Sequence, residues 1–135
     1  MSQLIRWVLI LPAAVAAWYA ALVIGIGLYA SLKKFCPLDQ IVSGGCTAPW
    51  YLMAEKAVVA FGAALAAVFV MTTCTFLAPS HKREIAITTF AIGSIVAIYM
   101  GAYLFFAQMV SAVIAGAITL FILIRRLAPP SLPNK

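Results

Sequence analysis

Residues 33–49 read KKFCPLDQIVSGGCTAP and form the only long polar interval between the hydrophobic runs of this chain. Of the 135 residues, 66% are hydrophobic and only 9% are charged, which is far from the composition of a soluble domain. A helix that spans a bilayer needs about 20 predominantly apolar residues. The length leaves room for four such helices, and the polar interval separates the first from the second. The sequence therefore predicts an all-α integral membrane protein, a four-transmembrane-helix bundle in a single domain.

The expected spans cover residues 4–32, 48–77, 85–105 and 110–127, followed by an extended tail over residues 128–135. Thr47 is the expected N-cap of the second span. Residues 85–124 carry no charge, and one helix of that length would measure about 60 Å, twice the thickness of the hydrocarbon core. We therefore expect this run to fold back near Gln108. The first run continues to Leu32, beyond the roughly 7–15 apolar residues of a signal peptide, so we expect it to be retained.

The basic residues predict the orientation of the spans, because Lys and Arg concentrate in short loops and span ends on the cytoplasmic side. With the N-terminus inside, the cytoplasmic side holds Arg6, Lys82, Arg83, Arg125, Arg126 and Lys135. The opposite side then holds only Lys33, Lys34 and Lys56. The expected topology is N-in and C-in in a bacterial inner membrane. It places loop 33–49 in the periplasm, and loop 78–84 and both termini in the cytoplasm.

Cys36 and Cys46 share the polar loop, separated by proline and glycine residues that let a short segment turn back. In an oxidising compartment such a pair is expected to form a disulfide. We expect a structural bridge that closes the outer loop. The alternative is a redox pair that exchanges disulfides, although catalytic pairs are usually closer in sequence and have a group nearby that lowers a thiol pKa. Cys74 stands alone and is expected to pack as a small hydrophobic residue.

Other kinds of chemistry find little support in the sequence. The cations sit at the ends of hydrophobic runs rather than on a basic face, which argues against nucleic-acid binding. His81 is the only histidine, and no cluster has the spacing of metal ligands, so we expect no metal and no cofactor. Glu55 is the acidic residue nearest the membrane interior, but it lies beside Lys56 and is expected to be solvated at the interface. These features predict a protein that is not an enzyme.

Small residues at intervals of four are the strongest remaining pattern. Such a stripe lets two helix backbones approach closely in lipid, where no hydrophobic effect drives association. The stripes are expected to serve helix packing or the docking of a partner. If they face outward, Gly25→Leu and Gly101→Leu should release that partner. The residues are Ala13, Ala17, Ala21 and Gly25 in the first span, Gly93, Ala97 and Gly101 in the third, and Ala112 and Gly116 in the fourth.

No motif in the sequence selects a protein family. The leading hypothesis is a non-catalytic accessory subunit that scaffolds or stabilises a larger membrane protein complex, with other membrane subunits and lipid as its partners. The second is a small homo-oligomeric transporter or lipid-carrier flippase, and the third is a periplasmic thiol-redox membrane protein. In the second hypothesis the path between protomers would be lined by Thr72, Thr73, Ser94, Tyr99, Tyr103 and Gln108.

Overall fold

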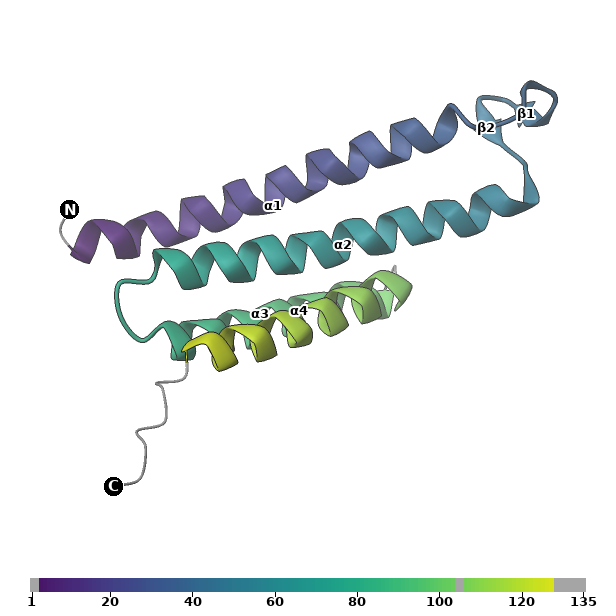
Figure 1. Ribbon diagram of the computed structural model, residues 1–135. Helices are drawn as coiled ribbons and strands as arrows, with labels where there is room; N and C mark the ends of the chain where they lie inside the picture. Colours follow the sequence, from purple (N-terminus) through teal and green to yellow (C-terminus); the bar gives the residue numbers. More distant parts are fainter. Residues whose placement is uncertain (1–2, 104–105, 128–135) are drawn as a thin grey trace.

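A computed structural model describes residues 3–103 and 106–127. The tail over residues 128–135 and the expected end of the third span at residues 104–105 lie outside the described residues. Four helices follow one another along the chain, and a small hairpin lies between the first two (Figure 1). The elements are α1 (Gln3–Lys33), the short 3-10 helix η1 (Leu38–Gln40), β1 (Ile41–Val42), β2 (Gly45–Cys46), α2 (Pro49–Leu77), α3 (Lys82–Tyr103) and α4 (Phe106–Leu127).

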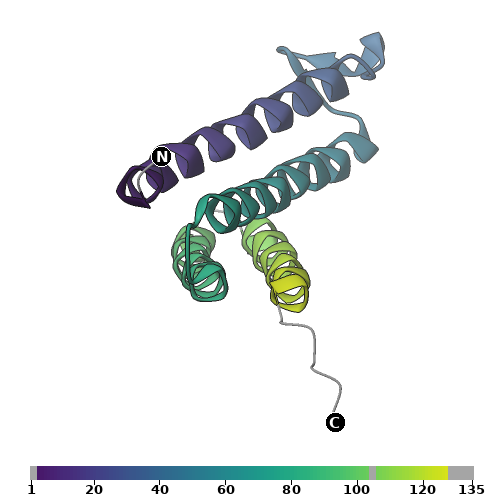
Figure 2. The same cartoon turned by 60° about the vertical axis from the view of Figure 1, so that its left-hand side comes forward.

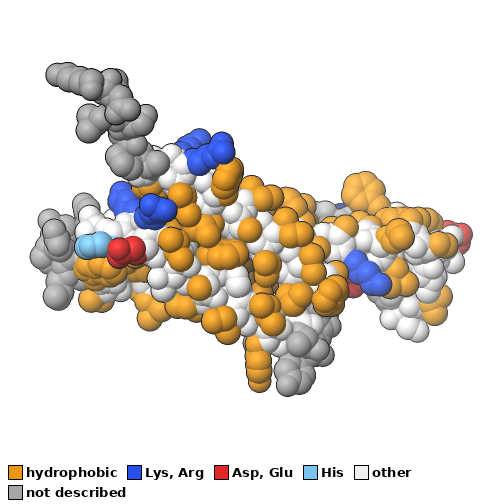
Figure 3. All heavy atoms as spheres, turned by 90° about the horizontal axis from the view of Figure 1, so that it is seen from below, with side chains coloured by type: hydrophobic (Ala, Val, Ile, Leu, Met, Phe, Trp, Pro, Cys, Tyr) orange, Lys and Arg blue, Asp and Glu red, His pale blue; other side chains and the backbone are white. Residues whose placement is uncertain are grey.

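Three helical segments in the described part of the chain are long and apolar enough to cross a membrane: Trp7–Lys33, Pro49–Leu77 and Phe106–Leu127. The chain is therefore an integral membrane protein by the length and composition of its helices. Large apolar side chains such as Leu11, Ile95 and Phe121 are exposed, as expected for surfaces in contact with acyl chains. Figure 3 shows hydrophobic side chains over the middle of one face, with the charged side chains toward its two ends.

Two expected helix boundaries are wrong. The N-cap of α2 is Ala48, which provides no side-chain hydrogen bond. Thr47 instead donates a hydrogen bond from its hydroxyl to the Gln40 carbonyl at 2.9 Å, within the loop. The break between the last two helices also comes earlier than expected, because α4 already begins at Phe106 and includes Gln108. A glutamine amide is no obstacle to a helix, so Gln108 was a poor guide to the position of the turn.

The four helices form an open arrangement in which α2 is central. The helix α2 packs against each of the other three helices, whereas α1 packs mainly on α2 (Figures 1 and 2). The pair α3 and α4 lies on the other side of α2 from α1 (Figure 2). The sequence predicts a bundle, but α1 packs mainly on one helix. Because α1 is apolar on every face, its other faces can contact lipid, and no hydrophobic effect brings a second helix against them. In lipid, helices pack closely where their residues are small.

Buried residues mark these helix contacts, and many of them are small. Ala21 of α1 and Ala86 of α3 are fully buried, with 0% of their surface exposed. The other buried apolar residues are Ala48, Tyr51, Met71, Cys74, Ala78 and Leu123. Small side chains at these positions let the backbones come close, so dispersion contacts and weak backbone interactions hold the helices together.

Candidate functional site

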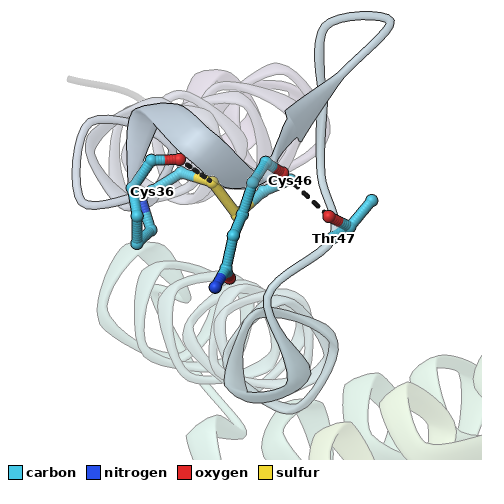
Figure 4. Close-up of a disulfide and its surroundings, with 5 residues drawn as sticks. Cys36, Cys46 and Thr47 are labelled. Carbon is cyan, nitrogen blue, oxygen red and sulfur yellow. Dashed lines mark hydrogen bonds between the residues drawn. A yellow bond between two sulfur atoms is a disulfide. The ribbon is translucent and has the colours of Figure 1, made fainter.

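The disulfide between Cys36 and Cys46 is confirmed, with the two Cα atoms 6.0 Å apart (Figure 4). The loop also contains a β-hairpin, β1–β2, that the sequence analysis missed. Ser43 and Gly44 form its two-residue turn with φ angles of 51° and 79°, the positive values that a type I′ turn requires. The backbone N–H of Thr47 donates to the Gln40 carbonyl at 2.9 Å and extends the pairing. The sequence Ile-Val-Ser-Gly is the pattern that could have predicted this hairpin.

The small-residue stripe of α1 is used within the chain. Ala13 and Ala17 are half-buried, Ala21 is fully buried, and Gly25 lies against Gly62 of α2. A Cβ added at Gly25 would lie 3.8 Å from the Cα of Gly62, so two backbones meet here without side chains between them. This stripe therefore packs α1 on α2, and Gly25→Leu would disturb the chain's own fold rather than a partner's docking.

The small residues of α3 and α4 differ from one another in their surroundings. A Cβ at Gly101 would overlap the side chain of Met109, and a Cβ at Gly116 would lie 3.2 Å from the ring of Phe90. Both glycines therefore serve packing inside the chain. Gly93 is exposed and has no atom within 4 Å of an added Cβ. Of the three glycines on α3 and α4, Gly93 alone offers open space.

A first cavity, of about 440 Å³, lies among α2, α3 and α4, with Trp18 of α1 at its edge. We call it the α3–α4 cavity. The small residues Gly93, Ala97, Gly101, Ala112 and Gly116 form part of its wall. Ser94 also lines it, and the Ser94 hydroxyl is buried without a hydrogen-bond partner. The wall of the cavity is therefore mostly apolar, with Thr89 and Gln108 as further polar residues and the Ser94 hydroxyl unsatisfied.

A second cavity, of about 540 Å³, lies between α1 and α2, and we call it the α1–α2 cavity. Gly25 and Gly62 lie in its wall, while Tyr29 and Glu55 also line it. It shares part of its wall with the first cavity. The shared residues are Trp18, Ala63, Ala66 and Gln108.

Glu55 has a defined environment in the α1–α2 cavity. The Tyr29 hydroxyl donates a hydrogen bond to Glu55 Oε1 at 3.3 Å. Tyr51, which is only 5% exposed, interacts with the same Tyr29 hydroxyl. Lys33 Nζ lies 5.2 Å from the centre of the Tyr29 ring, and within the described residues the Glu55 carboxylate forms no ion pair. Sequence reasoning placed Glu55 in the solvated interface. The two residues meet because the end of α1 and the start of α2 lie at similar depth in an antiparallel pair of helices.

The polar residues expected along a transport path are dispersed. Ser94 and Gln108 line cavities, whereas the Thr72 hydroxyl donates to the Val68 and Phe69 carbonyls of its own helix. Thr73 is half-buried on α2 and Tyr99 is exposed on α3, while the side chain of Tyr103 lies outside what the structure describes. Among residues 3–103 and 106–127, no three His, Cys, Asp or Glu side chains gather as metal ligands would.

Comparison with protein-family models, curated proteins and solved structures found no match.

Proposed function

We propose that this chain is a non-catalytic accessory subunit that scaffolds or stabilises a larger membrane protein complex. The observation that supports this proposal best is the open arrangement of the helices. The helix α1 packs mainly on α2, and two cavities flank α2 where a closed bundle would have helix contacts. Helices supplied by another membrane protein would fill these openings with the close packing that stabilises proteins in lipid.

We also propose that α3 spans the membrane together with α1, α2 and α4, which gives four spans in a bacterial inner membrane. Residues 85–103 of α3 are uncharged, and Lys82 and Arg83 at its start lie at the same end of the molecule as Arg125 and Arg126 at the end of α4 (Figure 1). This clustering favours a cytoplasmic location for that end, with loop 33–49 in the periplasm. A green fluorescent protein fused to the C-terminus should fluoresce in a bacterial host, and a dark fusion would contradict the N-in and C-in topology.

Purification from native membranes in a mild detergent, followed by mass analysis, tests the subunit hypothesis. We expect stoichiometric membrane proteins to co-purify with the wild-type chain. Gly93→Leu should weaken this association, because Gly93 faces open space and a larger side chain there leaves the chain's own packing intact. The matched control is Ile92→Leu, at an adjacent residue that is 59% exposed. A chain that purifies alone, or partners that bind equally to the wild type and Gly93→Leu, would contradict the proposal.

A small homo-oligomeric transporter or flippase is the second candidate. It is favoured by one observation, that Glu55 and Gln108 line the same cavity in an otherwise apolar part of the chain. Native mass spectrometry would distinguish the two functions. A pure dimer or tetramer that moves a charged amphiphile across proteoliposomes supports transport, whereas an absence of flux together with heterologous partners supports the accessory subunit.

A further inference from the structure

The α1–α2 cavity has the size and the chemistry of a ligand site. Its volume of about 540 Å³ lies within the range of about 300–1,000 Å³ that is typical of small-molecule pockets. Most of its wall is apolar. Tyr29 and Glu55 meet at one end, and Gln108 adds a third polar side chain in the wall shared with the α3–α4 cavity. Apolar walls with a small number of placed polar groups are what orient a ligand in such a pocket.

The cavity is elongated along the helix axis. Tyr29 and Trp18 both line it, and their separation of 11 positions in the sequence corresponds to a rise of about 16 Å along α1. Gly25 and Gly62 lie between these two ends, where the two backbones meet, so the groove runs alongside this close contact. The shape therefore fits a chain with its polar end near Glu55 and its apolar end near Trp18.

The charge of Glu55 selects the sign of the ligand's polar end. A carboxylate in an apolar surrounding is costly unless a cation or several hydrogen bonds compensate it. In the described part of the chain, the Glu55 carboxylate accepts a hydrogen bond from the Tyr29 hydroxyl at 3.3 Å and forms no ion pair. Lys33 is stacked on the Tyr29 ring and Lys56 is exposed, so neither neutralises the carboxylate directly.

We propose that the α1–α2 cavity binds a cationic single-chain amphiphile, with its positively charged head at Glu55 and its alkyl chain running toward Trp18. The polar end of the cavity lies near the loop at residues 33–49, where α1 ends and α2 begins. The head would therefore sit at interfacial depth and the chain in the hydrocarbon region, as in a lipid. Tyr29 positions the carboxylate through its hydroxyl group. This inference goes beyond the accessory-subunit proposal and does not depend on it.

Tryptophan quenching in dodecylmaltoside micelles tests the proposal. In the variant Trp7→Phe/Trp50→Phe, Trp18 is the one tryptophan that is left of the three in the chain. The probe is 12-bromododecyltrimethylammonium, whose terminal bromine quenches indole fluorescence at short range. We expect saturable quenching by this cation, with a half-saturation concentration at least tenfold lower than that of the neutral 12-bromododecanol.

Glu55→Gln in the same background should raise the half-saturation concentration for the cation at least tenfold and leave that for the alcohol unchanged. The matched control is Glu84→Gln, which removes a carboxylate at the opposite end of the molecule. Equal quenching by the cation and the alcohol, or an unchanged response of Glu55→Gln, would overturn the proposal and leave Glu55 as a solvated interfacial residue. The comparison of the two probes needs no change at Glu55, so it decides the question even if Glu55→Gln does not fold.

Two sources share this ligand chemistry, a soluble alkylammonium compound and an amine-bearing lipid. Addition of sphingosine, a single-chain lipid that carries a cationic amine, to the micelles separates them. Competition with the brominated cation assigns the site to a lipid amine, and undiminished quenching at matched micelle content assigns it to a soluble amphiphile. Either result supports a cation site at Glu55.

Discussion

Alanine substitutions at two glycines of α3 should change stability in opposite directions. Gly93 has open space around it, so Gly93→Ala adds a methyl group without a clash and removes the conformational freedom of glycine, a gain of about 0.5–1 kcal/mol. At Gly101 an added Cβ would overlap Met109, with Cγ and Sδ of that side chain only 2.8 and 2.9 Å away. Overpacking of this kind typically costs about 1–3 kcal/mol. We therefore expect the two variants to differ by about 1.5–4 kcal/mol.

Unfolding by sodium dodecyl sulfate in mixed micelles, followed by far-UV circular dichroism, measures this difference. Gly93→Ala should unfold at a higher detergent mole fraction than the wild type, and Gly101→Ala at a lower one. Because Met109 is the side chain in the way, Gly101→Ala/Met109→Gly should be more stable than the sum of the two single changes predicts, with a coupling of about 0.5–3 kcal/mol. Equal midpoints for the two alanine variants would refute the assignment of Gly101 to the contact between α3 and α4.

Three further predictions concern other contacts and use the same unfolding assay. The double variant Cys36→Ser/Cys46→Ser should lower the free energy of unfolding by up to about 2.7 kcal/mol, which is the loop-closure value for a sequence separation of 10. Unchanged stability would show that the hairpin alone orders the loop. Gly25→Leu should destabilise the chain by about 1–3 kcal/mol, because the backbone of Gly62 blocks the added side chain. Gly25→Ala should be tolerated, because its Cβ would lie 3.8 Å from the Cα of Gly62. Equal losses of stability in the two variants would contradict this geometry. The Ser111 hydroxyl lies 2.9 Å from two carbonyl oxygens, that of Ala60 in α2 and that of Gln108 in its own helix. Ser111→Ala should cost about 0.6 kcal/mol by removing the interhelical bond to Ala60, and a neutral result would show that the hydroxyl donates to Gln108 instead.

The sequence predicted what depends on composition and local chemistry. The all-α membrane class and the long helices follow from apolar runs, and the disulfide follows from two cysteines in one flexible loop. The helix starts were harder to place. The N-cap of α2 is Ala48, which has no side-chain hydrogen bond to offer. Thr47 was predicted as the cap from its side chain, but its hydroxyl donates to Gln40 within the loop.

The relative placement of the helices could not be derived from the sequence. In a soluble protein an apolar stripe shows which face of a helix points inward. The helices α1 and α2 are apolar on all faces and have no such stripe. The small-residue pattern identified surfaces of close approach without saying which pairs meet. Gly25 meets Gly62, Gly116 meets Phe90, and Gly93 meets no neighbouring atom. The cavity at Glu55 depends on this pairing and was therefore missed.

The outer disulfide also shortens the tether between α1 and α2. The connection between Lys33 and Pro49 contains 15 residues, but the covalent path through the bridge passes through only Lys34, Phe35, Cys36, Cys46, Thr47 and Ala48. The entropy of closing a flexible connection grows with the logarithm of its length, so this shorter path favours contact between the two helices by about 0.8 kcal/mol, a roughly fourfold higher effective concentration. Because α1 packs mainly on α2, reduction of the bridge would act on the helix with the least other support. The thiol–disulfide state of a surface loop thereby sets how firmly an entire membrane helix is held.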